Sequence, residues 1–184
     1  MPEKTDEDIA TDVQRGDAQA FGTLVERYED KLIRYARRFL RSSDDAEDLV
    51  QETFIKAYSN IKGFDTKRRF SPWIYRIAHN EFVNSMRKRS GKENISIFDF
   101  DLLFPHPVAK ETADDKVNKE ELKRMLGGYL EQLDPKYREP IVLYYFEDMD
   151  YGEIADILQI PSSTVGVRLR RGKAMLRKLM DKLN

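Results

Sequence analysis

The sequence has no cysteine and only two histidines, His79 and His106, among its 184 residues. The lack of cysteine excludes disulfides, thiolate metal sites and cysteine nucleophiles, and it fits a reducing compartment. The histidines lie far apart without flanking ligand residues, so we expect no metal site. Gly127-Gly128 lacks the lysine and the preceding strand of a phosphate-binding loop. We therefore predict no cofactor and no enzymatic activity.

Long hydrophobic runs are also missing. No stretch of about 18 consecutive apolar residues occurs, so we predict no membrane insertion. The polar start, Met1-Pro2-Glu3-Lys4, has no apolar segment of the signal-peptide type. These features together predict a cytoplasmic chain. Apolar residues still make up 40% of the sequence, with nine Tyr and ten Phe, which is enough to build small cores.

Charge is distributed unevenly although the net charge is only −1. Residues 1–66 hold 15 acidic and 10 basic residues, and residues 67–92 hold one acidic and eight basic residues. Residues 93–115 are acidic again, with six acids and one base, and residues 162–184 hold one acid and seven bases. Two cationic segments separated by an acidic one are typical of a protein that binds a polyanion at two places.

The hydrophobic pattern predicts an all-α fold, because apolar residues recur at helical spacing and no strand pair can be recognised. Start signals include Thr5 to Asp8, Ser71-Pro72, Asp134-Pro135 and Asp150 to Glu153. Residues 90–115 break the pattern with glycine, prolines and scattered acids. We predict two small helical domains, residues 5–90 and 115–184, joined by a flexible linker at residues 91–114. The linker contains an apolar run, Ile95 to Phe104, that something should cover.

The clearest functional motif lies near the end of the chain. A short helix at residues 151–158, a tight turn at Ile160-Pro161 and a longer basic helix follow the helix-turn-helix pattern. A solvated basic helix would be the alternative. The outer face of the basic helix should contact bases and phosphates through Ser162, Ser163, Thr164, Gly166, Val167, Arg168, Arg170, Arg171, Lys173 and Arg177.

Two further segments carry chemistry in the first domain. At residues 58–89, aromatic residues such as Phe70 and Trp73 interleave with lysines and arginines, which suits unpaired bases that stack on aromatic rings. The alternative is that these rings belong to a core. The acidic helix that begins near Asp44 turns Asp48, Gln51, Glu52 and Ile55 outward, either as a docking face for a basic partner or as simple N-terminal capping.

Taken together, the motifs resemble the extracytoplasmic-function (ECF) group of the sigma-70 family of bacterial RNA polymerase sigma factors. The resemblance covers nearly the whole chain. Residues 45–58 are similar to region 2.2, residues 70–80 to the junction of regions 2.3 and 2.4, and residues 151–165 to region 4.2. It implies a non-catalytic subunit that brings core RNA polymerase to promoter DNA and helps to open it. It also implies an anti-sigma factor as a partner.

The resemblance further implies a role for each segment. The acidic helix would dock on the clamp helices of the polymerase β′ subunit, and the second domain would touch the β flap. The polymerase-binding residues would be Asp45, Asp48, Gln51, Glu52 and Ile55. The helix-turn-helix would read the −35 element. The loop at residues 60–71 and the helix after it would hold the melted −10 element, through Phe64, Lys67, Arg68, Arg69, Phe70, Trp73, Arg76, Asn80, Asn84, Arg87 and Lys88.

The chain departs from the family pattern in its last helix. Gly166 and Val167 replace the usual polar or basic residues, and Gly172 replaces the usual alanine. Glycine costs about 1 kcal/mol relative to alanine in a helix interior, so this helix could require DNA to become ordered.

Two alternatives from other classes stay open on the sequence alone. One is a helix-turn-helix regulator that binds duplex DNA without polymerase, and the other is a helical adaptor with no DNA role. A regulator needs neither the aromatic-basic segment nor the acidic helix, and an adaptor would show no salt-dependent DNA binding.

Overall fold

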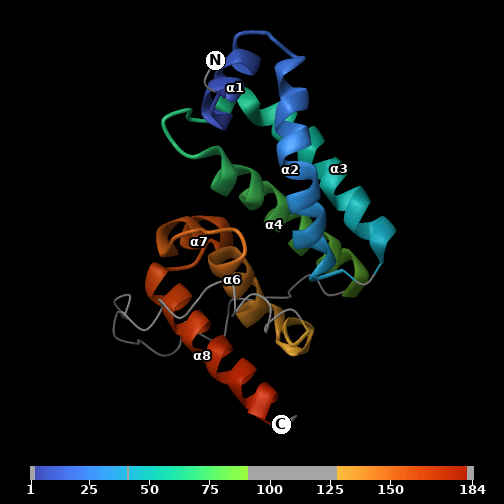
Figure 1. The fold of residues 1–184 in the computed structure, drawn as a ribbon. Helices are drawn as coiled ribbons and strands as arrows, with labels where there is room; N and C mark the ends of the chain where they lie inside the picture. Colours follow the sequence, from blue (N-terminus) through green and yellow to red (C-terminus); the bar gives the residue numbers. More distant parts are fainter. Residues whose placement is uncertain (1–2, 41, 91–127, 182–184) are drawn as a thin grey trace. The chain divides into compact units, whose positions relative to one another are not determined.

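The computed structural model describes residues 3–40, 42–90 and 128–181, except for the side chains of residues 87, 89 and 90. All regular structure in this part of the chain is helical, which confirms the all-α prediction. The chain divides into two compact units, Met1–Glu93 and Asn94–Asn184, drawn in Figure 1 in blue to green and in orange to red. The predicted linker at residues 91–114, with its apolar run, lies outside the described residues.

Within its described residues, the first unit contains four α-helices and one 3₁₀ turn. They are α1 (Asp6–Gln14), α2 (Ala20–Arg37), α3 (Ser43–Asn60), η1 (Ile61–Gly63) and α4 (Phe70–Ser90). The helix α3 packs against both α2 and α4, and α1 packs against α2 and η1. Capping fixes the start of α1, since the Asp8 amide donates to Thr5 Oγ1 and the Thr5 amide donates to Asp8 Oδ2. This capping box was predicted from the sequence.

The core of the first unit is rich in aromatic side chains. The largest fully buried ones are Tyr35, Phe70, Tyr75 and Phe82. Tyr35 meets Tyr75 edge to face at 5.3 Å between ring centroids, and Phe39 lies 4.8 Å from Phe82. Aromatic pairs at such distances add to the hydrophobic gain of burial. They join α2 and α4 into one rigid support for the surfaces described below.

The second unit, as far as it is described, consists of η3 (Leu130–Gln132), α6 (Pro135–Tyr145), α7 (Tyr151–Leu158) and α8 (Ser162–Asp181). The helix α8 packs against both α6 and α7. The predicted capping box at the start of α7 is present, since the Glu153 amide donates to Asp150 Oδ1 at 2.8 Å. Gln159 ends α7 in the left-handed conformation, with φ of 54°, and so makes the tight turn between α7 and α8.

Gly172 lies inside α8, which is helical from Ser162 to Asp181. The residue is buried against α6. A Cβ atom at this position would lie 2.5 Å from Ile141 Cδ1 and 3.4 Å from Tyr137 Cβ, inside the ordinary contact distance of carbon atoms. Glycine therefore allows the two helix axes to approach closely, and this packing offsets its poor helix propensity.

Candidate nucleic-acid interface

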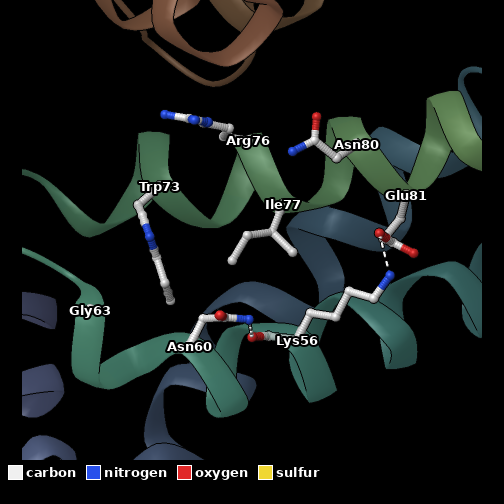
Figure 2. Close-up of a pocket in the computed structure, with 8 residues that line it drawn as sticks. All are labelled: Lys56, Asn60, Gly63, Trp73, Arg76, Ile77, Asn80 and Glu81. Carbon is white, nitrogen blue, oxygen red and sulfur yellow. Dashed lines mark hydrogen bonds and ion pairs between the residues drawn. The ribbon is translucent and has the colours of Figure 1, made fainter.

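A pocket of about 420 Å³ lies between α3 and α4 in the first unit. We call it the α3–α4 pocket. Figure 2 shows Trp73 and Ile77 extending from α4 toward α3, whereas Arg76 and Asn80 leave α4 on another side. The Trp73 side chain is only partly buried, so part of its ring is accessible. The residues that line the pocket are Lys56, Asn60, Gly63, Trp73, Arg76, Ile77, Asn80 and Glu81.

The polar groups at the α3 side of the pocket are held in place by their neighbours. Lys56 Nζ lies 2.6 Å from Glu81 Oε1 and 3.7 Å from Glu52 Oε1. The hydrogen bond that Lys56 donates to Glu81 is the largest effect that raises the pKa of Lys56 above its usual value. Asn60 donates through Nδ2 to the Lys56 carbonyl at 2.8 Å, which leaves its side-chain oxygen directed elsewhere. An indole face beside amide and cationic groups is suited to a planar, polar ligand such as a nucleobase.

Beside the pocket runs a short basic segment, residues 64–69, which we call the basic loop. Asp65 shapes it, because its side chain accepts from the Lys67 amide at 3.0 Å and its carbonyl accepts from the Arg68 amide at 2.9 Å. Such turns are a common use of aspartate. Lys67, Arg68 and Arg69 are all exposed, so the loop presents three consecutive cationic side chains next to Gly63 and Trp73.

Two aromatic residues that we predicted to contact DNA are instead part of the core. Phe64 is 6% exposed and Phe70 is fully buried. Their rings meet edge to face at 5.4 Å, and each lies within 5.4 Å of Trp73. Phe70 also packs on Tyr28 of α2. Because both side chains are buried, Phe64 and Phe70 cannot stack on bases, and of the three aromatic residues predicted to contact the −10 element only Trp73 is partly accessible.

The exposed face of α4 continues from the pocket as a line of polar side chains. Arg76, Asn80, Asn84 and Lys88 are all exposed and follow one another at four-residue intervals, so they lie along one side of the helix. The side chain of Arg87 lies outside the described part of the structure. The four exposed residues thus form one strip about three turns long that starts at the α3–α4 pocket.

The predicted docking face on α3 is exposed as expected from its spacing. Asp48, Gln51 and Glu52 are exposed, and Ile55 keeps 60% of its surface accessible. Asp45, one turn nearer the helix start, is half-buried. The predicted docking residues of α3 are therefore accessible apart from Asp45, with the apolar Ile55 on the same face as acidic and amide groups.

The helix-turn-helix in the second unit differs from its prediction at three positions. Gly166, Val167 and Arg168 were expected on the outer face, but all three are buried, with Arg168 at 2% and Val167 at 3% exposure. At about 100° per residue, Arg168 falls beside the inner stripe that includes Val165 and Leu169. Val167 falls on the other side, so this turn of α8 is covered from more than one direction, and the single-stripe prediction was too simple.

The remaining predicted residues of α8 are accessible to different degrees. Ser162, Arg170 and Arg177 are exposed, whereas Ser163, Thr164, Arg171 and Lys173 are half-buried. The start of α8 is therefore open at its first residue, and cations continue along the exposed side of the helix. Helix N-termini and arginines both favour phosphate oxygens.

The sequence analysis did not predict three residues of the α3–α4 pocket, namely Lys56, Ile77 and Glu81. Trp73, Ile77 and Glu81 follow one another at four-residue intervals on α4, as Lys56 and Asn60 do on α3. This spacing was a usable signal, but only the packing of α3 on α4 shows that the two rows face each other. Within the described ranges, no three His, Asp or Glu side chains are grouped as a metal ion would require. None of the helices there is long and apolar enough to cross a membrane.

Comparisons with known proteins identify the family of both units. The sigma-70 region 2 family model matches residues 24–92, and the sigma-70 region 4 model matches residues 123–176. The chain is 36% identical to the ECF RNA polymerase sigma factor SigW of Bacillus subtilis, over 93% of this chain and 94% of the relative. It is 32% identical to the ECF RNA polymerase sigma-E factor of Haemophilus influenzae, over 97% of each chain.

Solved structures give the same result. The chain is similar to CnrH in its complex with the cytosolic domain of CnrY, with a TM-score of 0.70, 29% identity and coverage of 97% of this chain and 99% of that one. It is also similar to RpoE of Bartonella quintana in complex with the anti-sigma factor NepR, with a TM-score of 0.65, 27% identity and coverage of 89% and 98%. Neither a duplex-binding regulator nor an adaptor accounts for matches along the whole chain. The chain belongs to the ECF group of the sigma-70 family and is a sigma factor, a protein that directs RNA polymerase to initiate transcription.

Proposed function

We propose that the α3–α4 pocket and the basic loop together hold the non-template strand of the −10 element once it is unpaired. The observation that carries this proposal is the position of Trp73, whose partly accessible ring lines the pocket. Three exposed cations of the basic loop precede it by a few residues in the chain. A base that leaves the duplex can stack on an indole ring, while lysine and arginine side chains follow the phosphates. A pocket of about 420 Å³ is within the size range of small-ligand sites.

The α4 strip would extend this contact along the same strand. Arg76 and Asn80 line the pocket, and Asn84 and Lys88 continue from it on the same side of the helix. Amide side chains can donate to and accept from base edges, whereas cations contact phosphates without distinguishing sequence. We therefore assign base recognition mainly to Asn80 and Asn84, and orientation of the backbone to Arg76, Lys88 and the basic loop.

The outward face of α3 is proposed as the docking surface for the β′ clamp helices of the polymerase. Ile55 would supply apolar contact area at its centre, with Asp48, Gln51 and Glu52 as polar and acidic contacts. Complementary charge around an apolar centre raises the rate and the specificity of association. Asp45 is half-buried at the edge of this surface and would contribute less.

In the second unit, the exposed residues of α8 are proposed to contact the −35 duplex, and this unit is proposed to touch the β flap. Ser162 begins the helix, and Ser163 and Thr164 follow in its first turn, and a helix N-terminus favours phosphate oxygens. Arg170 and Arg177 are exposed and would contact phosphates or guanine edges. Arg171 and Lys173 are half-buried and would contribute through the ends of their side chains.

Regulation by an anti-sigma factor is proposed by similarity. RpoE of Bartonella quintana was solved with an anti-sigma factor, and CnrH with the cytosolic domain of CnrY. The proposal places the protein in the cytoplasm with the polymerase, and catalysis belongs to the polymerase because the sigma-70 family is not a class of enzymes.

The central test separates strand opening from polymerase binding. Holoenzyme is assembled from this chain and core polymerase of the organism that encodes it, and start sites are mapped by transcription of a genomic library. Trp73→Ala should reduce permanganate-detected opening by the worth of one stacked base, about 1–3 kcal/mol, with core affinity unchanged. Trp73→Phe keeps an aromatic face and should retain most of the opening.

A second variant supplies the opposite result in the same assay. Asp48→Lys, on the α3 face, should weaken core binding while the holoenzyme that does form opens promoters normally. Equal losses of opening and core binding in Trp73→Ala would contradict the role given to the pocket. Failure of the chain to start any transcript with core polymerase would contradict the whole proposal.

A further inference from the structure

One face of α1 contacts both ends of the segment that carries the basic loop. Glu7 and Gln14 are seven residues apart, so they lie on the same side of α1, about 10 Å apart along its axis. Gln14 contacts the segment where it leaves α3, and Glu7 contacts it where α4 begins. None of the interactions assigned above to DNA or polymerase involves α1.

Gln14 holds the first end of the segment, next to α3, through hydrogen bonds from its side-chain amide. Its Nε2 donates to the Ile61 carbonyl at 2.7 Å and to the Phe64 carbonyl at 2.8 Å. These two carbonyls belong to the first residue of the η1 turn and to the residue that follows it, and the turn contains Gly63 of the α3–α4 pocket. The arrangement requires a side chain with two N–H donors. A carboxylate of the same shape would instead face two carbonyl oxygens and repel both.

Glu7 holds the second end of the segment, at the start of α4, through its carboxylate. Its Oε1 accepts from the Phe70 amide at 2.8 Å. Phe70 is the first residue of α4, so this amide has no partner within the helix, and a negative charge is favourable there. Trp73 follows three residues later, one turn into α4. The position of the Trp73 ring therefore depends on how the start of α4 is held.

A second contact from the α1 region holds the same point. Tyr28 donates to Asp6 Oδ2 at 2.5 Å, and its ring packs edge to face on Phe70 at 5.4 Å. Burial is the largest effect that raises the pKa of Tyr28 above its usual value, followed by the hydrogen bond to Asp6. The phenol therefore stays protonated and keeps donating. Between the two tied ends only residues 65–69 span the surface, with Lys67, Arg68 and Arg69 exposed.

We propose that Gln14 and Glu7 are positioning residues that fix the basic loop and Trp73 in the arrangement that receives the unpaired −10 strand. This inference rests on the proposed function of the pocket. If residues 65–69 became ordered only when DNA binds, binding would cost conformational entropy. Because α1 holds both ends of this segment, most of that cost is avoided. Neither residue needs to touch DNA, because both act through the backbone of the loop.

The test measures binding of the unpaired strand directly. Holoenzyme is titrated against a fluorescein-labelled single-stranded oligonucleotide that carries the non-template −10 sequence of a mapped start site. Gln14→Glu should weaken this binding by about tenfold, as expected for two hydrogen bonds replaced by repulsion. Gln19→Glu is the matched control, because Gln19 is exposed, makes no side-chain cap, and carries the same charge change away from the loop.

Glu7 supplies a second, independent comparison. Glu7→Ala should weaken oligonucleotide binding severalfold, whereas Glu7→Gln keeps an acceptor oxygen and should restore most of it. Core affinity and binding of a −35 duplex fragment by the same holoenzyme should stay at the wild-type level in all four variants.

The outcomes separate this inference from the proposed function. If Trp73→Ala weakens oligonucleotide binding but the Gln14 and Glu7 variants do not, the positioning role is wrong and the pocket assignment stands. If Trp73→Ala has no effect either, the pocket assignment fails. If Gln14→Glu lowers core affinity and oligonucleotide binding equally, the residue serves general stability only, and the inference is overturned.

Discussion

The close approach of α8 to α6 at Gly172 predicts how an alanine there would change the free energy of unfolding. Two opposing effects, helix propensity and steric overlap, determine whether the change is a gain or a loss. Gly172→Ala should gain about 1 kcal/mol from helix propensity. The new Cβ would lie 2.5 Å from Ile141 Cδ1, which is fully buried and has little room to move. Overpacking of this kind costs roughly 1–3 kcal/mol. We therefore expect a net loss of about 1 kcal/mol in the free energy of unfolding.

A double-mutant cycle isolates the steric effect. Ile141→Val removes the Cδ1 atom that the new Cβ would meet, at a cost of about 0.5–1.5 kcal/mol on its own. In the double variant the alanine methyl occupies the vacated space and keeps its propensity gain, so stability should return close to wild type. The two changes should then be coupled by about 2 kcal/mol, whereas independent sites would give additive effects.

The assay is urea unfolding followed by circular dichroism, with a control in the other unit. Gly22 lies within α2, and nothing lies within 4 Å of a Cβ added there. Gly22→Ala should therefore stabilise its unit by up to about 1 kcal/mol through propensity alone. Fluorescence of Trp73, the single tryptophan, follows that unit separately. Stabilisation by Gly172→Ala, or additivity with Ile141→Val, would refute the packing argument.

Two further predictions concern local conformation and pH. Gln159→Gly should stabilise the second unit by about 1 kcal/mol in thermal unfolding, because glycine adopts the observed left-handed conformation without the Cβ penalty, while Gln159→Ala should give no such gain. Tyr28→Phe should lower stability at pH 7 by about 1.5–3 kcal/mol through loss of the hydrogen bond to Asp6. Since folding raises the pKa of Tyr28, its stabilising contribution is complete below the ordinary tyrosine pKa of about 10 and is lost as pH rises above it. The difference between wild type and Tyr28→Phe in urea titrations should thus shrink above that pH, and a constant difference would contradict the cause given for the shift.

Features that depend on a few neighbouring residues could be predicted from the sequence. The capping boxes at Thr5 and Asp150 involve side chains and amides three residues apart, so the local pattern determines them. The outward face of α3 follows from helical spacing, and its members are exposed as that spacing requires: Asp48, Gln51, Glu52 and Ile55. The all-α architecture is the sum of such local signals.

Features that depend on which helices pack together could not be predicted in this way. The burial of Val167 and Arg168 requires neighbours on more than one side of α8, and helical spacing describes only one side at a time. The contribution of Lys56 and Asn60 to the pocket depends on the packing of α3 on α4. Gly172 is a poor residue by helix propensity alone, and its role depends on contact with Ile141 of a different helix.

The aromatic residues near the basic loop show why composition alone gives an ambiguous prediction. A ring that stacks on bases and a ring that packs in a core have the same chemistry and, here, the same cationic neighbours in sequence. Phe64 and Phe70 are distinguished from Trp73 only by their burial in the folded unit. Yet the buried pair supports the exposed ring, because each contacts Trp73 and the backbone of each accepts from or donates to α1. The two residues therefore support Trp73 within the proposed −10 site by packing against its ring. Substitutions that shrink them should disturb the pocket without removing any contact to DNA.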